Sequence, residues 1–192
     1  MGWHNDQVSK LETEKILAVA KDCLDIEGDF VELGCYKGDT SLMLAEILQG
    51  TSKKLWIYDS FEGLPEKSAK DESAVGVDFK KGELLVSKRE VKMRFLRSGL
   101  SVPKIVKAWF DDLNDKDLPD KIAFAFLDGD LYESIRDSLK LVKDKMAAGG
   151  AIMVHDYINE ALPGVAKAVD EWVKVKKYNI VRYESLAIIV IK

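Results

Sequence analysis

The sequence predicts an α/β fold: a mostly parallel sheet with helices on both faces and an antiparallel strand at one side. Three observations predict it. Short apolar runs alternate with amphipathic segments of helical periodicity, as strands and crossover helices do in parallel sheets. One run, 122–127, is apolar throughout, which is typical of a strand buried on both faces. The chain closes with two apolar runs joined by Glu184-Ser185, which predicts an antiparallel hairpin.

The elements of the first half are marked by caps and by hydrophobic spacing. Ser9 and Glu12 form a capping box that begins the N-terminal helical segment, residues 1–28. Either Thr40 or Ser41 is expected to cap the second helix. The expected elements are, in order, a helix from Ser9 to about Glu27, a strand over 30–33, a helix over 42–48, a strand over 55–58, a polar loop over 60–81, a helix over 83–98 with Leu84, Val91 and Phe95 on one face, and a weaker strand within 102–108.

The second half repeats the alternation. The apolar run 122–127 is followed by a helix from about Tyr132, whose apolar spacing continues to Met146 and which Gly149-Gly150 should end. The remaining elements are a strand over 151–154, a helix opened by Pro163-Gly164, and the final runs 178–183 and 186–191.

Composition limits the protein class. The 192 residues suit one domain, 1–192, with a sizeable core, since 47% are hydrophobic and 32% charged. The net charge of −4 gives no sign of a nucleic-acid or membrane-surface partner. Cys23 and Cys35 lie outside any CxxC motif, and the N-terminus lacks the apolar core of a signal peptide. These features predict a reduced, cytoplasmic protein.

Four of the expected strands end in polar or small residues. In parallel sheets, ligands bind at the carboxyl ends of the strands, so these residues are candidates for a site. They are Glu32 and Gly34, Asp59, Asp128, and His155-Asp156.

The first strand leads into a glycine turn that could hold a nucleoside. Gly34 and Gly38 flank the start of a helix, where the backbone can approach a ligand and N–H groups are available. The three-glycine dinucleotide fingerprint and the P-loop are both absent. Asp59, 21 positions after Gly38, could accept hydrogen bonds from a ribose diol. An ordinary tight turn and a turn-capping aspartate are the alternative interpretations.

The third and fourth strand ends carry carboxylates suited to a cation. Asp128 and Asp130 lie where a buried strand meets a helix, and repulsion between them favours a bound cation or a raised pKa. Asp156 would lie beside them, with His155. Alternatively, Asp130 caps the helix and His155 is a packed, hydrogen-bonded core residue.

Together these segments resemble the macrocin O-methyltransferase family, metal-dependent class I methyltransferases of antibiotic sugars. Three phrases carry the resemblance from about residue 30 onward: DSFEGLP at 59–65, LDGDLYES at 127–134 and PGVAKAVDEW at 163–172. Residues 31–41 are similar to the general S-adenosylmethionine motif. Residues 109–113 are similar to a further family segment, although Ala108 stands where glycine is usual.

The resemblance implies a Rossmann-like class I methyltransferase with a seven-stranded, mostly parallel sheet and an antiparallel last strand. It implies an O-methyltransferase that uses S-adenosylmethionine. The first motif strand begins only about 30 residues into the sequence, which is short for the family, so we expect a more open acceptor site and hence a sugar or glycoconjugate hydroxyl as acceptor. The insertion at 60–100, a loop plus a helix, is then a candidate lid. The implied cofactor-binding residues are Glu32, Gly34, Tyr36, Gly38, Thr40, Ser41, Asp59, Ser60, Trp109, Phe110, Asp111 and Asp128.

The resemblance also implies catalytic and metal-binding residues. Asp128 and Asp130 would be catalytic, with Asp130 as the base for the acceptor hydroxyl. The metal, Mg²⁺ or Mn²⁺, would be bound by Asp128, His155 and Asp156. The family usually has aspartate at position 155, and imidazole binds Mg²⁺ poorly and prefers softer metals.

Three other functions remain open. The acceptor could be a catechol or another phenolic small molecule, or the chain could bind S-adenosylmethionine without turnover because of His155. A nucleotide-dependent oxidoreductase would need the missing third glycine.

The first helix or the final hairpin could pair subunits in a homo-oligomer.

Overall fold

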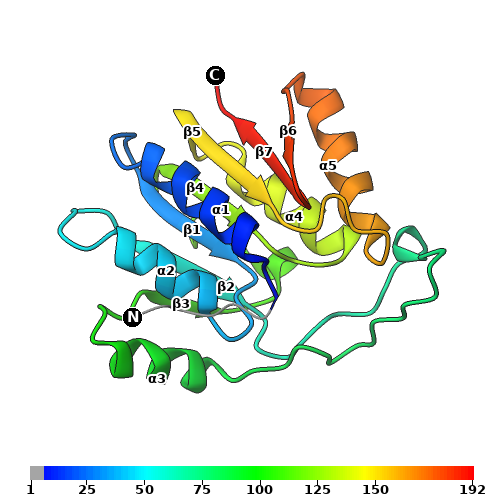
Figure 1. Ribbon diagram of the computed structural model, residues 1–192, viewed down its shortest axis with the longest axis horizontal. Coiled ribbons are helices and arrows are strands. Elements are labelled where there is room, and N and C mark those ends of the chain that lie inside the picture. The colour runs from blue at the N-terminus through cyan, green and yellow to red at the C-terminus, as the bar shows by residue number, and fades with distance from the viewer. Residues whose placement is uncertain (1–6) are drawn as a thin grey trace.

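The computed structural model describes residues 7–192, and these form a layered α/β fold (Figure 1). The strands are β1 (Asp29–Leu33), β2 (Leu55–Asp59), β3 (Lys104–Lys107), β4 (Ile122–Leu127), β5 (Met146–Val154), β6 (Val181–Tyr183) and β7 (Leu186–Val190). The helices are α1 (Lys10–Asp22), α2 (Asp39–Ile47), α3 (Lys88–Ser98), α4 (Tyr132–Val142) and α5 (Pro163–Lys176), with short 3-10 turns η1 (Ala69–Asp71) and η2 (Phe110–Asp112).

The strands form one seven-stranded sheet in the order β3-β2-β1-β4-β5-β7-β6. Strands β1 to β5 pair in parallel, while β7 pairs antiparallel with both β5 and β6. The predicted fold class is confirmed, as is the final hairpin. Leu33 is in register with both Tyr58 and Leu127, and Leu127 with Val154. The carboxyl ends of four strands therefore meet at one edge of the sheet.

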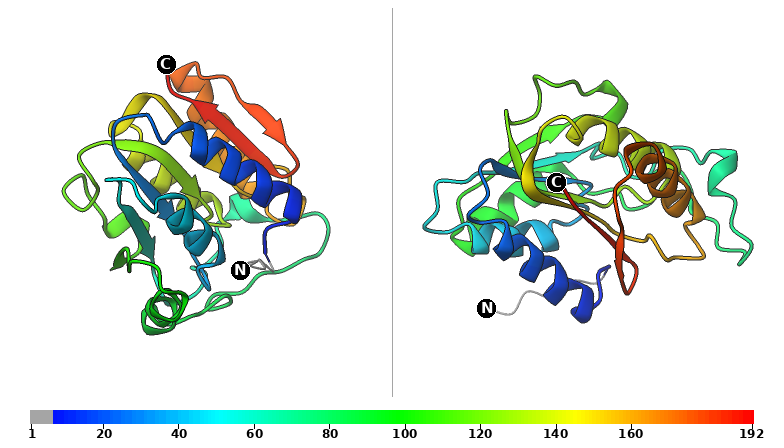
Figure 2. Two further views of the ribbon diagram at one scale, coloured as in Figure 1. Left: turned by 60° about the vertical axis from the view of Figure 1, so that its left-hand side comes forward. Right: turned by 90° about the horizontal axis from the view of Figure 1, so that it is seen from above.

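Helices cover both faces of the sheet. Figures 1 and 2 show α1, α2 and α3 on one face and α4 and α5 on the other. Alternate residues of β1 follow this division, because side chains along a strand point to opposite faces. Phe30 packs in the core beneath α1 and α2, whereas Val31 and Leu33 pack in the core beneath α4 and α5.

Helix α1 ends at Asp22 and not near Glu27, and the structure corrects three further local predictions. Helix α2 begins at Asp39 and its N-cap is Gly38, which has a left-handed backbone, so neither Thr40 nor Ser41 is its cap. The Ser41 hydroxyl donates instead to Glu32. Helix α3 starts after Ser87, which forms a capping box with Glu90, so Leu84 lies outside the helix.

The end of α4 is the third correction. The helix ends at Val142, while Met146 and the two glycines belong to β5. An apolar residue at helical spacing also fits a buried strand, so periodicity did not separate the two. A Cβ on Gly150 would lie 2.7 Å from the carbonyl oxygen of Ala123 in β4. The glycine therefore permits a close approach of two strands where their register shifts.

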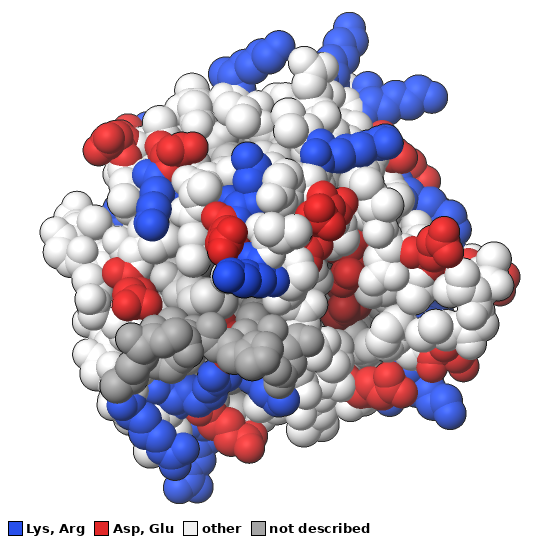
Figure 3. Space-filling view, viewed as in Figure 1, with Lys and Arg blue, Asp and Glu red and all other residues white. Residues whose placement is uncertain are grey.

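Acidic and basic side chains are mixed over the face shown in Figure 3, in keeping with the small net charge. Within residues 7–192, none of the helices is both long and apolar enough to span a bilayer.

Candidate functional site

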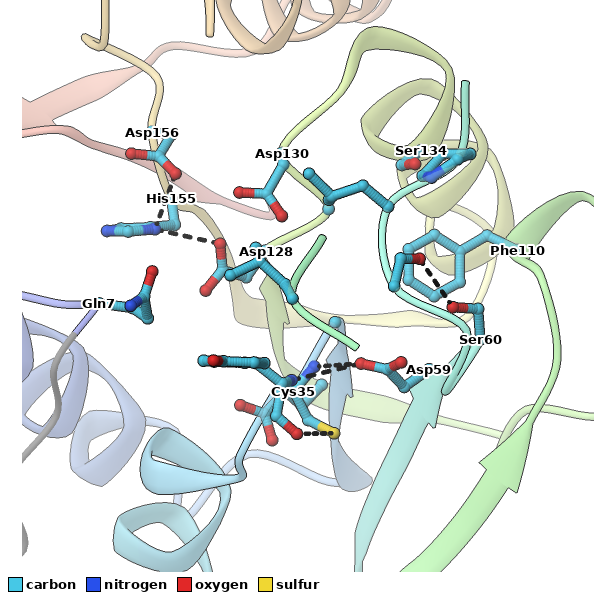
Figure 4. Close-up of a pocket in the computed structure, with 18 of the residues that line it drawn as sticks. Gln7, Cys35, Asp59, Ser60, Phe110, Asp128, Asp130, Ser134, His155 and Asp156 are labelled. Carbon is cyan, nitrogen blue, oxygen red and sulfur yellow. Dashed lines mark hydrogen bonds and ion pairs between the residues drawn. The ribbon is translucent and has the colours of Figure 1, made fainter. Parts of the chain in front are cut away.

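The carboxyl ends of β1, β2, β4 and β5 surround a cavity of about 400 Å³ (Figure 4). In the sheet, the chain continues from β1 to β2 on one side and from β4 to β5 on the other side, so it leaves the neighbouring strands β1 and β4 in opposite directions. Parallel sheets bind ligands in the crevice at such a switch point. The volume falls in the range typical of small-molecule sites.

Most of the residues singled out in the sequence line this cavity. They are Glu32, Gly34, Tyr36, Thr40, Asp59, Ser60, Trp109, Phe110, Asp111, Asp128, Asp130, His155 and Asp156. Gly38 and Ser41 do not line it. Gly38 lies beneath Val91 of α3, and Ser41 is buried with its hydroxyl on Glu32.

The turn after β1 passes directly against the end of β4. Gly34 has a φ of +90°, and a Cβ there would lie 1.9 Å from the carbonyl oxygen of Asp128. Only glycine combines this backbone with this approach. Its N–H donates to the carbonyl of Tyr58 at 2.9 Å. The turn is thus fixed to both neighbouring strands.

Asp59 organises the same turn from the end of β2. One carboxylate oxygen accepts from the N–H groups of Cys35 at 2.9 Å and Tyr36 at 3.3 Å, and the other accepts from Phe61 at 2.7 Å. The turn-capping interpretation is therefore confirmed. A carboxylate has about four acceptor positions, so one stays available toward the cavity.

Glu32 is a buried carboxyl group behind the turn. Burial raises its pKa to about 8; the Ser41 hydroxyl opposes the shift, while the charges of Asp128 and Asp59 add to it. Glu32 is consequently mostly protonated at neutral pH.

Phe110 of η2, Ser60 after β2 and Ser134 of α4 contribute to the opposite wall. Phe110 approaches Gly129, where a Cβ would lie 3.4 Å from the ring and 2.8 Å from Ser134. Figure 4 shows Phe110, Ser60 and Ser134 on the same side of the cavity. This wall can hold a flat ring against a polar edge.

Asp128, His155 and Asp156 form a compact cluster at the ends of β4 and β5. His155 Nδ1 lies 3.0 Å from Asp128 Oδ1 and 3.2 Å from Asp156 Oδ2. One ligand atom from each residue lies within 4.8 Å of the others. Burial opposes charge on the His155 ring, but Asp128, Asp156 and Glu12 hold its pKa above the ordinary value. The cluster can hold a divalent cation or a protonated imidazole.

Asp130 completes the acidic end of the cavity. Its carboxyl group is half-buried, and burial, together with Asp128 and Asp156, raises its pKa well above the usual range. Asp130 and Asp156 both have left-handed backbones, with φ values of 59° and 58°. Such conformations are uncommon outside glycine and concentrate at functional sites.

Sequence reasoning missed two buried acidic residues near the cavity. Glu12 was interpreted only as a capping residue, yet its Oε2 lies 3.9 Å from His155 Nε2. The His155 ring, with donors on Ser185 and Ser9, holds the pKa of Glu12 well below its usual range although burial opposes this. The capping box marks Glu12 in the sequence as the third residue of a helix, but nothing near it in the sequence indicates that His155 is its neighbour.

The second missed residue is Asp71, in the segment 60–87 that links β2 to α3, hereafter the strap. Its carboxylate accepts from the N–H and hydroxyl of Ser68 and, at 2.7 Å, from the N–H of Tyr132, the first residue of α4. Lys70 pairs with Glu171 of α5 at 3.0 Å. The strap is thus anchored at its middle, and its residues Pro65, Phe79 and Leu84 line the cavity.

Known proteins resemble this chain in sequence and in fold. Residues 5–182 match a family model described as Macrocin-O-methyltransferase (TylF). The chain is 33% identical over 145 residues to an 8-demethyl-8-(2,3-dimethoxy-alpha-L-rhamnosyl)-tetracenomycin-C 4'-O-methyltransferase of Streptomyces olivaceus, which covers 71% of this chain and 55% of the relative. It is 30% identical over 156 residues to a demethyldecarbamoylnovobiocin O-methyltransferase of Streptomyces niveus, covering 77% and 59%.

The chain therefore spans less than two thirds of the length of these two relatives. Among solved structures, that of the O-methyltransferase NovP superposes with a TM-score of 0.84 at 26% identity, covering 94% of this chain and 79% of that one.

Proposed function

The chain belongs to the macrocin O-methyltransferase family, and on this premise we propose that it transfers a methyl group from S-adenosylmethionine to a hydroxyl of a sugar or glycoconjugate. One observation carries the proposal: the glycine turn after β1 and the carboxylates after β4 and β5 open into the same cavity. The proposal includes a cytoplasmic location, supported by Cys23 and Cys35, which are both buried and free.

The turn fits a nucleoside cofactor. Gly34 brings the turn backbone to the cavity wall, and α2 starts at a glycine that offers no side-chain cap to its first-turn N–H groups. Asp59 would accept from the ribose, and Trp109, Phe110 and Asp111 would surround the base. The chemistry that the cofactor supplies is a methyl group on a sulfonium, already reactive toward an oxygen nucleophile.

Residues at the acidic end fit a divalent cation. Asp128, His155 and Asp156 would hold it, because one ligand atom from each of these two carboxylates and the imidazole lies within 4.8 Å of the others. The chemistry that such an ion supplies is a lowered pKa and a fixed position for an acceptor hydroxyl.

Asp130 is the residue proposed to take the proton. A general base works best when its pKa lies near the operating pH, and burial beside Asp128 and Asp156 moves the pKa of Asp130 in that direction. Its left-handed backbone holds the carboxyl group at the cavity. The cavity walls align the acceptor oxygen with the methyl group, as an in-line displacement requires.

The acceptor class is proposed from the relatives. The relative of Streptomyces olivaceus is named as a 4'-O-methyltransferase of a rhamnosyl tetracenomycin. A further relative from Micromonospora griseorubida, 25% identical over 158 residues, is named as a mycinamicin III 3''-O-methyltransferase. The half-buried Asp130 and Asn159, both lining the cavity, offer hydrogen-bonding groups suited to sugar hydroxyls.

The test has two stages. Calorimetric titration with S-adenosylhomocysteine should give micromolar binding, and failure of folded protein to bind it would refute the methyltransferase proposal. Transfer from labelled S-adenosylmethionine to a panel of glycosides and catechols, with Mn²⁺ or Mg²⁺, should favour glycosides. Asp130→Asn should lower kcat by about 100-fold or more without changing cofactor affinity. Asp120→Asn, at an exposed position outside the cavity, is the matched control.

A further inference from the structure

Glu12 is anchored far more extensively than a capping residue needs to be. It is only 6% exposed, although it lies in the first turn of α1. Oε2 accepts from the N–H of Ser9 at 3.0 Å, as a capping box requires. Oε1 accepts from the N–H of Ser185 at 3.0 Å and from its hydroxyl. The helix N-terminus and the β6–β7 turn thus fix both carboxylate oxygens.

The comparison with Glu90 shows what capping alone looks like. Glu90 occupies the same position in the capping box of α3, and within residues 7–192 its side chain accepts hydrogen bonds only from Ser87. It is exposed. Burying a carboxylate is costly unless it serves a partner, so the burial of Glu12 needs a reason beyond the cap.

That partner is His155. Glu12 Oε2 lies 3.9 Å from Nε2 of the imidazole, and the two carboxylates of Asp128 and Asp156 lie on the Nδ1 side. Figure 4 shows the Nδ1 side of the ring turned toward Asp128 and Asp156. The ring is therefore held between one carboxylate behind it and two in front of it.

We propose that Glu12 is the outer carboxylate of a Glu12–His155–metal arrangement, and that this arrangement makes the site select a divalent transition-metal ion such as Mn²⁺ or Co²⁺ over Mg²⁺. The inference rests on the proposed function only for the presence of a metal at this position. A metal-binding histidine ordinarily donates its other ring N–H to a carboxylate, which fixes its tautomer and orientation. An Nε2–H that faces Glu12 across 3.9 Å would leave the lone pair of Nδ1 for the ion.

The donor set gives the selectivity. Mg²⁺ prefers oxygen ligands in strict octahedral geometry, whereas imidazole nitrogen suits the later divalent metals. Here one of the three candidate ligand atoms is a nitrogen, and the negative charge of Glu12 lies 3.9 Å behind it, on the Nε2 side of the ring. Glu12 is thus a positioning residue that acts through His155.

The experiment measures metal binding directly. Metal-free full-length protein is titrated with Mn²⁺, Co²⁺ and Mg²⁺ by calorimetry, and the Co²⁺ complex is followed by its visible absorption. Wild-type protein should bind Mn²⁺ and Co²⁺ at least about tenfold more tightly than Mg²⁺. Glu12→Gln should weaken Mn²⁺ binding by about 10- to 100-fold and alter the Co²⁺ spectrum. Glu90→Gln, which loses a capping box only, should leave both unchanged.

Two further variants address stability and coupling. Glu12→Asp keeps the negative charge but moves it away from His155 by the length of one methylene, so it should also weaken Mn²⁺ binding. This variant tests the inference if Glu12→Gln folds poorly. His155→Asp should shift the preference toward Mg²⁺, and in that background Glu12→Gln should no longer affect metal affinity. S-adenosylhomocysteine affinity is measured on each variant and should not change.

The outcomes separate this inference from the proposed function. A preference for Mg²⁺, an equal effect of Glu12→Gln and Glu90→Gln, or no metal binding by protein that binds S-adenosylhomocysteine would overturn the inference and leave the cofactor class intact. Loss of S-adenosylhomocysteine binding with Mn²⁺ selectivity retained would overturn the methyltransferase proposal and support the inference.

Discussion

Replacing Asp71 by alanine should release the strap from the rest of the fold. Its buried carboxylate accepts three hydrogen bonds, from the N–H of Ser68 at 2.9 Å, from the hydroxyl of Ser68 at 2.7 Å and from the N–H of Tyr132 at 2.7 Å. The last of these is the one that joins the strap to α4. Gly164, the second residue of α5, packs so closely that a Cβ there would lie 1.8 Å from Asp71 Oδ1.

The magnitude follows from which donors lose their partner. A hydrogen bond to a charged acceptor contributes about 1.5–3 kcal/mol, and an unpaired buried N–H costs a similar amount. The Ser68 donors can turn to water, whereas the Tyr132 N–H is buried. We therefore expect Asp71→Ala to lower the free energy of unfolding by about 3 kcal/mol, or about 1 to 2 M in the urea midpoint.

Gly164→Ala should destabilise the protein for the same reason, because the new methyl group displaces the carboxylate. In the Asp71→Ala background the clash with the carboxylate is absent and only the contact with Tyr132 Cβ at 2.9 Å remains, so the two changes should be less than additive by about 1 kcal/mol. The assay is urea unfolding followed by tryptophan fluorescence. Additive effects would show that Gly164 and Asp71 do not share a contact.

Proteolysis measures the strap itself. Trypsin should cut faster after the exposed Lys80 and Lys81 once Asp71 is removed, because the strap loses its anchor to α4. The control is Asp78→Ala, which removes an exposed carboxylate paired with Lys67 at 2.9 Å on the same strap. If Asp71→Ala changes the urea midpoint and the cleavage rate no more than Asp78→Ala does, the anchoring role is refuted.

Three further predictions concern the cavity. Gly34→Ala should lower the free energy of unfolding by about 3 kcal/mol or more, because its Cβ meets the carbonyl oxygen of Asp128 at 1.9 Å; Gly50→Ala, with φ of +79° but nothing within 4 Å, should lose only about 1 kcal/mol. Because the folded-state pKa of Glu32, about 8, exceeds its unfolded value, its stabilising contribution is complete below about pH 4.5 and is lost as the pH rises through 8. Urea unfolding at pH 6 and 8.5 should therefore show a smaller alkaline loss of unfolding free energy in Glu32→Gln, by about 2.5 kcal/mol, and equal losses would contradict the assignment. Asp59→Asn should weaken S-adenosylhomocysteine binding by about tenfold or more in calorimetry, because an amide has one acceptor oxygen where three N–H groups converge; unchanged affinity would show that the turn does not depend on this carboxylate.

The alternation of strands and helices was predictable because it depends on local patterns. The apolar run of β4 and the Ser9 capping box are each made of residues that lie close together in the sequence, so backbone geometry alone relates them. The convergence of Asp59, Asp128 and Asp156 also followed, because parallel strands end at one edge whatever their order. The limit was reached at Met146, where an apolar residue fitted a helix and a strand equally well.

The sequence by itself therefore determined the fold class, the edge of the sheet that bears the site, and the chemical character of that site. Tertiary structure alone decided which buried carboxylates face the site residues: Glu12 lies 173 positions from Ser185 and still contacts it, and Asp71 lies 61 positions from Tyr132. The physical reason is that caps and periodicity act over one turn of chain. Contacts between α1, the strap and the sheet depend instead on strand order and helix packing, which no short stretch of sequence encodes.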